Sequence, residues 1–186
     1  MAQHVCPWWI GMLLASPIRR WFEDPEKQLQ PYIREGMTVL EPGPGMGFFT
    51  LPMARMVGPT GRVIAVDIQE KMLSGLRRRA EHAGLLARVE LRQARPDSLG
   101  IDDLRGKVDL VVAIAVVHEM PSDEAFFCET AGTLKEGGRL LLIEPRGHVN
   151  AHKFTHEIHS ACDAGLATSE RIIGGHSSVA VFAKCR

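Results

Sequence analysis

The sequence has 186 residues, a length that suits one domain with a substantial hydrophobic core. Hydrophobic residues make up 45% of it and charged residues 24%, which is the composition of a soluble globular protein. The 22 basic residues are balanced by 22 acidic ones. The chain therefore lacks the positive charge that nucleic-acid-binding proteins use, and we expect no nucleic-acid partner.

Neither a secretory nor a membrane segment is predicted. The apolar run at residues 8–15 follows no basic region, which argues against a signal peptide. That run has about eight residues, whereas a bilayer-spanning helix needs ~20. The four cysteines are widely spaced and form no C-x-x-C pair, which predicts reduced thiols in a cytoplasmic protein: Cys6, Cys128, Cys162 and Cys185.

Residues 1–30 precede the regular alternation of strands and helices. We expect short helices there, the third of which should run from Pro25 to about Leu29 with Asp24 as its N-cap. The three tryptophans of the chain all lie in this segment: Trp8, Trp9 and Trp21.

A glycine-rich stretch follows the first predicted strand. The apolar strand at 37–41 ends in Glu41 and leads into Gly43, Gly45 and Gly47. Because glycine has no Cβ, this backbone can turn sharply and lie close against a ligand. The helix expected at 47–57 would point its N-terminal amides at the same ligand.

A second strand, at 62–67, ends in Asp67, at the position where nucleotide-binding folds hold a ribose. The segments 168–173 and 177–183 flank Gly174-Gly175 and predict an antiparallel hairpin. The elements in between alternate as in a doubly wound α/β sheet: helix 69–83, strand 87–92, a short segment near 98–104, strand 107–115, helix 122–134, strand 138–144 and helix 150–164.

The chain carries an acidic residue, three alternate glycines and a later Val-Asp pair: Glu41, Gly43, Gly45, Gly47 and Val66-Asp67. This pattern resembles the cofactor site of class I S-adenosylmethionine-dependent methyltransferases. An NAD(P)-dependent dehydrogenase instead carries G-x-G-x-x-G, and Phe48 stands where its third glycine would fall. A carboxylate ahead of the glycines also suits a ligand that bears an amino acid, because it would repel a pyrophosphate.

The resemblance implies a seven-stranded Rossmann-like sheet over residues 31–186, mostly parallel with a C-terminal antiparallel hairpin. In the resembled family, extra N-terminal helices often cover the methyl-donor pocket, so residues 1–30 are expected to be covering helices. The alternative is a packing arm whose tryptophans fill the core.

The resemblance also implies roles for single residues. The glycines approach the methionine part of S-adenosylmethionine, and Glu41 lies near its ammonium group or an ordered water. Asp67 holds the ribose hydroxyls, caps the helix that begins near Gln69, or does both, and Ile68 packs on the adenine. The implied cofactor-binding residues are Glu41, Gly43, Pro44, Gly45, Gly47, Asp67, Ile68, Ala94 and Ala113.

The end of the third strand departs from the family pattern. Arg95 stands where many relatives carry an acidic residue for the adenine amino group, and arginine has no hydrogen-bond acceptor. Either the backbone around Ala94 and Arg95 reads the adenine, or Asp97 takes that role.

The fourth strand runs into a histidine-containing turn that resembles the family's turn below the sulfonium. Methyl transfer depends mostly on positioning, and a base is needed only where the acceptor starts out protonated. A histidine titrates in the right range, so His118 is the candidate catalytic base or substrate-orienting residue. Glu119 could orient it. A structural hydrogen bond within the turn is the alternative role.

One stripe of the last predicted helix is rich in histidine, with spacings of 4, 4, 3 and 4 residues: His148, His152, His156, His159 and Asp163. Phe154, Ile158 and Ala161 should face the core. The stripe could bind a transition metal, line the substrate site or be plain surface, and no metal ligand is assigned.

The predicted function is transfer of a methyl group from S-adenosylmethionine to a small-molecule acceptor, by a cytoplasmic monomer or homodimer. The pattern is similar to the small-molecule group that includes ubiquinone/menaquinone-type C-methyltransferases. The alternatives are a methyltransferase-like protein that binds the cofactor without chemistry, an NAD-dependent oxidoreductase, and a methyltransferase with a protein acceptor. The acceptor and the methylated atom do not follow from the sequence.

Overall fold

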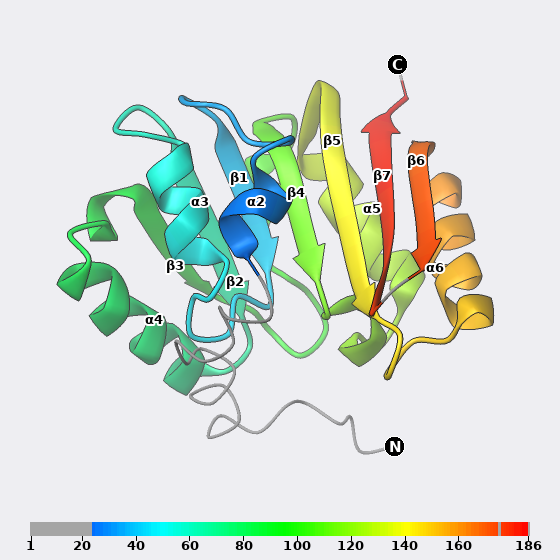
Figure 1. Ribbon diagram of the computed structural model, residues 1–186, viewed down its shortest axis with the longest axis horizontal. Helices are drawn as coiled ribbons and strands as arrows, with labels where there is room; N and C mark the ends of the chain where they lie inside the picture. The colour runs from blue at the N-terminus through cyan, green and yellow to red at the C-terminus, as the bar shows by residue number, and fades with distance from the viewer. Residues whose placement is uncertain (1–23, 175, 186) are drawn as a thin grey trace. The chain divides into compact units, whose positions relative to one another are not determined.

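The computed structural model describes residues 24–174 and 176–185. The helices expected within residues 1–23, their tryptophans and Cys6 lie outside these residues, so the covering role of the N-terminal segment stays a prediction (Figure 1). The described chain forms two compact units, one of residues 24–96 and one that begins at Asp97. Each unit contributes its own strands and helices.

The first unit contains three parallel strands in the order β3-β2-β1. The Asp24 carboxylate accepts the N–H groups of Glu26 and Lys27 at 3.1 Å, which confirms Asp24 as a helix N-cap. The elements in chain order are α2 (Pro25–Leu29), β1 (Thr38–Pro42), α3 (Thr50–Met56), β2 (Arg62–Asp67), α4 (Glu70–His82) and β3 (Val89–Gln93).

Strand pairing in this unit places the expected site residues on one edge of the sheet. In the parallel register Glu41 of β1 pairs with Ala65 of β2, two residues before Asp67. The carboxyl ends of both strands therefore lie on the same edge, where ligands of open α/β sheets bind. Helix α3 begins at Thr50 rather than at residue 47, because Gly45 and Gly47 have positive φ angles of 53° and 86° that no right-handed helix contains.

The second unit contains four strands in the order β4-β5-β7-β6. Strand β5 pairs parallel with β4 and antiparallel with β7, and β7 pairs antiparallel with β6, which confirms the predicted terminal hairpin. In Figure 1, α5 and α6 lie together behind β5, β7 and β6. The elements are β4 (Val108–Ile114), α5 (Asp123–Thr133), β5 (Leu134–Pro145), α6 (Ala151–Asp163), β6 (Leu166–Gly174) and β7 (Ser177–Lys184).

Strand β5 is longer than predicted, because it begins at Leu134, which pairs with Val108 of β4. Short 3₁₀ turns connect other elements, at Leu86–Arg88, Asp102–Leu104 and Val117–Glu119. The cysteines of the described chain, Cys128, Cys162 and Cys185, are exposed free thiols.

The seven strands belong to one mixed sheet, mostly parallel with antiparallel C-terminal strands, so the predicted α/β fold class is confirmed. The apolar runs of β4 and β5 are buried, as expected of strands that are covered on both faces. Among the described helices none has both the length and the apolar character that a bilayer crossing needs.

Candidate functional site

The glycine loop after β1 has the conformation that its sequence predicts. Gly45 and Gly47 lie in the left-handed region, where a side chain would strain the backbone. A Cβ on Gly47 would lie 2.4 Å from Cδ1 of Leu76, so packing also excludes a larger residue there. A Cβ on Gly45 would meet none of the described atoms within 4 Å. The loop is thus packed against the protein at Gly47 and open at Gly45.

Gly43 and Pro44, which connect β1 to Gly45, are held by contacts with the rest of the protein. Gly43 donates its N–H to the carbonyl oxygen of Val66 at 2.9 Å, which ties the start of the loop to the end of β2. Pro44 is buried. The first turn of the loop is therefore held by the sheet.

Glu41 is a buried carboxyl group at the end of β1, with only 4% of its surface exposed. Its Oε2 accepts a hydrogen bond from the Thr50 hydroxyl at 2.6 Å, across the glycine loop. Burial raises the pKa of Glu41 to about 8, the Thr50 bond opposes that rise, and the negative charge of Asp67 adds to it. This edge of the sheet therefore holds two acidic groups that a cation would stabilise. Thr50 was not identified from sequence, because no local pattern marks it.

Asp67 ends β2 and is nearly buried, at 9% exposure. Its Oδ1 accepts the backbone N–H of Gln69 at 2.8 Å, which fixes the orientation of the carboxylate. Helix α4 begins only at Glu70, and its N-cap Gln69 makes no side-chain capping bond, so Asp67 holds the turn before the helix. Asp67 is therefore not the N-cap of this helix, which was one of its two expected roles, and ribose binding stays a separate prediction.

Ile68 and Ala94 lie beside Asp67. Ile68 is an exposed large apolar residue, with 38% of its surface accessible. The N–H of Ala94 donates to the carbonyl oxygen of Asp67 at 3.0 Å, which extends the β2–β3 pairing into the loop. Arg95 is exposed, and which group would read an adenine stays open. In this unit the structure brings together the Glu41, glycine-loop, Asp67, Ile68 and Ala94 positions.

In the second unit, β4 ends in an unusual backbone turn. Ala113 is fully buried within the strand. Two residues later Ala115 has φ of 53°, the one positive value at a non-glycine residue of the described chain. Such a conformation costs an L-residue roughly 1–2 kcal/mol and occurs preferentially at functional sites. An alanine carries no sequence signal for it, so the sequence analysis did not identify this turn.

His118 follows this turn and contacts a buried carboxylate. Its Nδ1 lies 2.6 Å from Oε2 of Glu144, a residue of β5 with no exposed surface. The other oxygen of Glu144 accepts the N–H of Val117 at 2.9 Å. The sequence analysis named Glu119 as the residue that could orient His118, whereas the carboxylate on Nδ1 is that of Glu144. A carboxylate only accepts hydrogen bonds, so Nδ1 carries the proton and the lone pair of a neutral ring is on Nε2.

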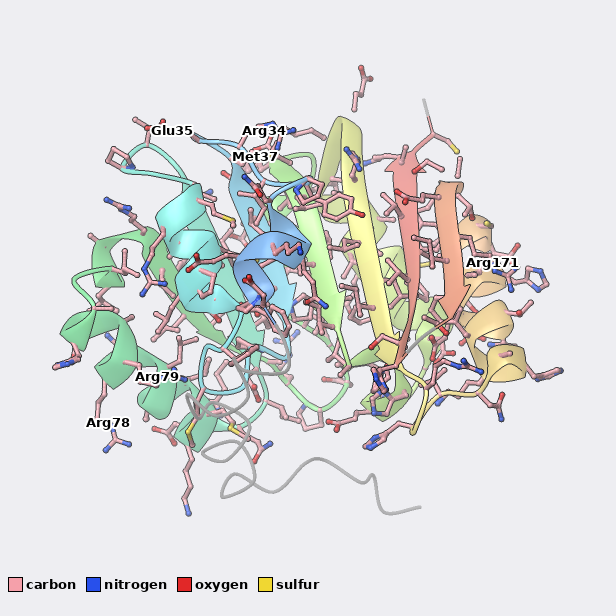
Figure 2. All side chains as sticks on the ribbon, viewed as in Figure 1. Arg34, Glu35, Met37, Arg78, Arg79 and Arg171 are labelled. Carbon is pink, nitrogen blue, oxygen red and sulfur yellow. The ribbon has the colours of Figure 1, made fainter. Side chains whose placement is uncertain are left out.

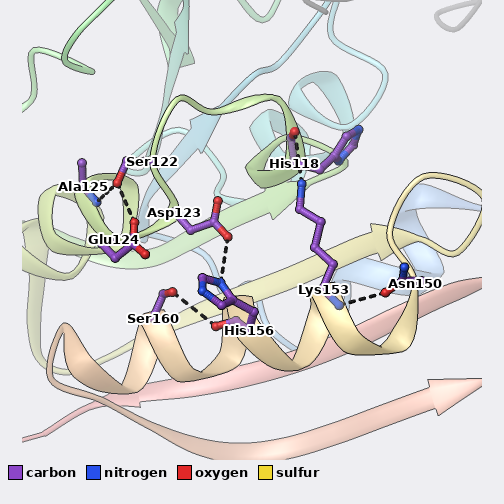
Figure 3. Close-up of polar contacts among 9 residues, drawn as sticks. All are labelled: His118, Ser122, Asp123, Glu124, Ala125, Asn150, Lys153, His156 and Ser160. Atoms are coloured by element: carbon purple, nitrogen blue, oxygen red, sulfur yellow. Dashed lines mark hydrogen bonds and ion pairs between the residues drawn. The ribbon is translucent and has the colours of Figure 1, made fainter. Parts of the chain in front are cut away.

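Two further side chains surround His118. The ring of His148 meets that of His118 edge to face, with centroids 5.3 Å apart. The ammonium group of Lys153, on α6, lies 3.5 Å from the His118 carbonyl oxygen (Figure 3). Lys153 therefore links α6 to the turn that carries His118.

The other residues of the histidine stripe are exposed. Phe154, Ile158 and Ala161 of the same helix are buried, as predicted. Figure 3 shows His156 directed toward Asp123, with its Nδ1 3.4 Å from Oδ2. Within residues 24–174 and 176–185, no three His, Cys, Asp or Glu side chains come together as a metal site would require. The stripe residues named by the sequence are His148, His152, His156, His159 and Asp163, and of these only His148 contacts His118.

Glu157 of α6 is a buried carboxyl group that the sequence analysis missed. It has no exposed surface, and neither of its oxygens has a hydrogen-bond partner. Burial, together with the charges of Glu144 and Asp123, raises its pKa to about 8. Its environment therefore favours the protonated, neutral form.

A family sequence model described as "Methyltransferase domain" matches residues 33–181, which is most of the chain. The chain belongs to this methyltransferase family. Its structure is similar to that of an S-adenosylmethionine-dependent methyltransferase from Aquifex aeolicus, with a TM-score of 0.86 and 24% sequence identity. That match covers 97% of this chain and 100% of the other. The predicted methyltransferase family is thereby confirmed.

Two further proteins to which this methyltransferase is similar have more specific names. The ubiquinone/menaquinone biosynthesis C-methyltransferase UbiE of Escherichia fergusonii is 34% identical over 112 residues, which are 60% of this chain and 44% of UbiE. The chain therefore spans less than half the length of this relative. Geranyl diphosphate C-methyltransferase from Streptomyces coelicolor, solved with Mg²⁺, a substrate analogue and S-adenosyl-L-homocysteine, has a TM-score of 0.72 at 15% identity. That match covers 86% of this chain and 75% of the other.

Proposed function

We propose that this methyltransferase transfers a methyl group from S-adenosylmethionine to a small-molecule acceptor and releases S-adenosylhomocysteine. The observation that carries the proposal is the buried Glu41 carboxyl group beside an open glycine loop. Burial and the negative charge of Asp67 both disfavour the ionised form of Glu41. The ammonium group of a bound methionine moiety would supply a positive charge that stabilises this form. A pyrophosphate would increase the repulsion instead.

The residues at this edge fit the parts of the cofactor. Glu41, oriented by Thr50, would accept hydrogen bonds from the ammonium group. Asp67, oriented by the N–H of Gln69, would accept those of the ribose hydroxyls. Ile68 offers an exposed apolar side chain for the adenine, and Gly43, Pro44, Gly45 and Gly47 let the backbone approach the methionine part. Ala113 and Ala94 complete the proposed binding residues.

His118 is the proposed general base. When bound, the cofactor supplies a methyl group on a positively charged sulfur. An electron pair of the acceptor would form a bond to the methyl carbon as the carbon–sulfur bond breaks in line with it, and S-adenosylhomocysteine would leave. An acceptor hydroxyl, amine or acidic C–H must also lose a proton, and Nε2 of His118 can take it because Glu144 holds the ring through Nδ1. The resulting imidazolium would be stabilised by the buried carboxylate of Glu144.

A small-molecule acceptor is supported by the names of two relatives, a ubiquinone/menaquinone biosynthesis C-methyltransferase and a geranyl diphosphate C-methyltransferase. A cytoplasmic location and a monomeric or homodimeric state are parts of the same proposal. Size-exclusion chromatography with light scattering tests the second of these.

Thermal unfolding with S-adenosylhomocysteine, S-adenosylmethionine and NADH tests the cofactor. A ligand at ~100 times its Kd adds about 2.7 kcal/mol to the free energy of unfolding, which is an easily measured rise in Tm. We expect this rise with both S-adenosyl compounds and not with NADH. A rise with NADH alone would contradict the proposal.

A turnover screen then tests the acceptor. The protein is incubated with S-adenosylmethionine and a set of phenols, hydroquinones, isoprenoid diphosphates and peptides, and released S-adenosylhomocysteine is measured. We expect turnover with a member of the small-molecule classes. Cofactor binding with turnover on peptides alone would refute the small-molecule acceptor, and binding with no turnover at all would favour a methyltransferase-like protein without chemistry.

A further inference from the structure

Arg79 reaches from α4 to the backbone of the glycine loop. Its Nη1 donates a hydrogen bond of 2.5 Å to the carbonyl oxygen of Met46, the residue between Gly45 and Gly47. Arg79 is half-buried, while its neighbour Arg78 is exposed and projects outward from α4 (Figure 2). The guanidinium group of Arg79 therefore contacts the loop that the cofactor is proposed to touch, whereas that of the preceding residue, Arg78, is on the surface.

The packing between α4 and the loop is close at two more positions. A Cβ on Gly75 would lie 3.0 Å from Cγ of Met46, so this helical glycine admits the Met46 side chain. A Cβ on Gly47 would collide with Leu76. Met46 is 8% exposed and Leu76 is fully buried. Gly75, Leu76 and Arg79 lie on adjoining turns of one face of α4, and together they contact Met46 and Gly47.

Loop rigidity matters for binding affinity. A loop that adopts the binding conformation in only a fraction of molecules binds its ligand more weakly by that same fraction. Three consecutive loop residues, Gly45-Met46-Gly47, include two glycines, and glycine has the largest conformational freedom of any residue. Without a contact that holds them, these residues would sample many conformations, and binding would have to order them.

We infer that Arg79 is a positioning residue of the cofactor site, which holds the Met46 carbonyl so that the glycine loop is preformed for S-adenosylmethionine. The inference rests on the proposed function, since it assigns Arg79 to the same site. Arg79 does not touch the cofactor in this account. It acts through Met46, and Gly75 and Leu76 supply the surface against which the loop is held.

Removal of Arg79 also removes a positive charge from the protein near the proposed cofactor site. S-adenosylmethionine carries a sulfonium and an ammonium group besides one carboxylate, so its net charge is positive, and removal of a positive charge from the protein would on net charge alone favour its binding. Loss of the Met46 contact predicts the opposite. Because Arg78→Met removes the same charge without the Met46 contact, a comparison of the two variants separates the loop contact from the change in net charge.

Calorimetric titration with S-adenosylhomocysteine and S-adenosylmethionine tests the inference in four proteins: the wild type, Arg79→Met, Arg79→Lys and Arg78→Met. We expect Arg79→Met to raise Kd at least tenfold for both ligands. Arg79→Lys should lie in between, because lysine keeps the charge and an N–H donor but not the planar reach of arginine. Arg78→Met, which removes the same charge from the exposed neighbouring position, should stay within twofold of the wild type.

Hydrogen exchange without ligand provides a second readout that general destabilisation would not reproduce. We expect faster exchange at the amides of residues 45–49 in Arg79→Met and Arg79→Lys, and unchanged exchange in β2. Unchanged Kd values for either Arg79 variant, or an equal loss in Arg78→Met, would overturn the inference and leave the proposed function intact. If the wild-type protein binds neither S-adenosyl compound, the proposed function fails and the inference fails with it.

Discussion

Nδ1 of His118 lies 2.6 Å from Oε2 of Glu144, whose other oxygen accepts the N–H of Val117. The two residues are far apart in the sequence, on the turn after β4 and at the end of β5. The bond leaves Nε2 as the ring nitrogen that can accept a proton. His118 is thereby prepared for the role proposed for it, by a carboxylate that is completely shielded from solvent.

Glu144→Gln should change the tautomer of His118. The glutamine carbonyl can still accept the N–H of Val117, so the local backbone should survive, but the charge that favours a proton on Nδ1 is lost. Nitrogen-15 NMR of the neutral imidazole should show Nδ1 protonated in the wild type and a shift toward Nε2–H in the variant. A wild-type ring protonated on Nε2, or the same tautomer in both proteins, would refute the positioning role of Glu144.

His118→Asn should separate binding from chemistry. The asparagine amide can take the place of Nδ1–H and keep the hydrogen bond to Glu144, while the base itself is removed. With an acceptor that must lose a proton, methyl transfer should fall by a factor of ~10²–10⁴, whereas the Kd of S-adenosylhomocysteine should stay within twofold. Methyl transfer at the wild-type rate would assign His118 a purely structural role.

Glu41→Gln should make the protein without ligand more stable and the cofactor complex weaker. The pKa of Glu41 is about 8 in the folded state against an ordinary value of 4.5. The folded protein therefore keeps a proton that the unfolded chain releases, and this contribution to stability is fully present below pH 4.5 and lost as pH rises through about 8. Between these values the unfolding free energy of the wild type should fall relative to Glu41→Gln, by at most ~1.4 kcal/mol per pH unit. Urea unfolding at pH 5 and pH 8 measures the difference.

Glu157→Gln is the matched control for that experiment. Glu157 is also buried, with a pKa raised to about 8, and it shows the same sign of pH dependence. It is not among the proposed binding residues. The Kd of S-adenosylhomocysteine should rise at least tenfold in Glu41→Gln and stay unchanged in Glu157→Gln. Equal affinities in the two variants would remove Glu41 from the cofactor site.

Gly45→Ala and Gly84→Ala should differ in binding but not in strain. Gly45 and Gly84 have φ of 53° and 67°, and at either position a Cβ would meet no described atom within 4 Å. Each substitution should therefore cost roughly 1–2 kcal/mol of stability from the left-handed backbone alone. Only Gly45→Ala should weaken S-adenosylhomocysteine binding, because its methyl group would occupy the open side of the loop. Calorimetry on both variants checks this, and a similar loss in Gly84→Ala would attribute the effect to strain.

Most of the fold could be predicted from sequence because the strands are apolar runs bounded by glycines. The end of β2 at Asp67 and the terminal hairpin are examples, and both were predicted within a residue or two. Helix α3 was placed too early because the hydrophobic pattern alone does not show that Gly47 has a positive φ. The start of β5 at Leu134 was missed because that residue is defined by its pairing with Val108, which is a long-range contact.

The site was predictable only where its residues are neighbours in sequence. Glu41, the glycines and Asp67 follow one another at strand ends, and the fold brings such ends together. Thr50, Glu144 and Arg79 act through contacts with residues 9, 26 and 33 positions away, and no local pattern marks them. Ala115 has a conformation that its residue type does not predict. Of the histidine stripe, His152, His156, His159 and Asp163 lie on α6, whereas His148 lies in the turn before it. The spacing could not distinguish a solvent-exposed helix face from a ligand site.

The most direct measurement is calorimetric titration of the wild-type protein and Asp67→Ala with S-adenosylhomocysteine. The account predicts binding to the wild type and a loss of at least tenfold in affinity for Asp67→Ala, since its two carboxylate oxygens are proposed to hold the ribose hydroxyls. Binding of equal strength to both proteins would contradict the proposed place of the ribose. No binding to the wild type would contradict the whole account of this edge of the sheet as a methyl-donor site.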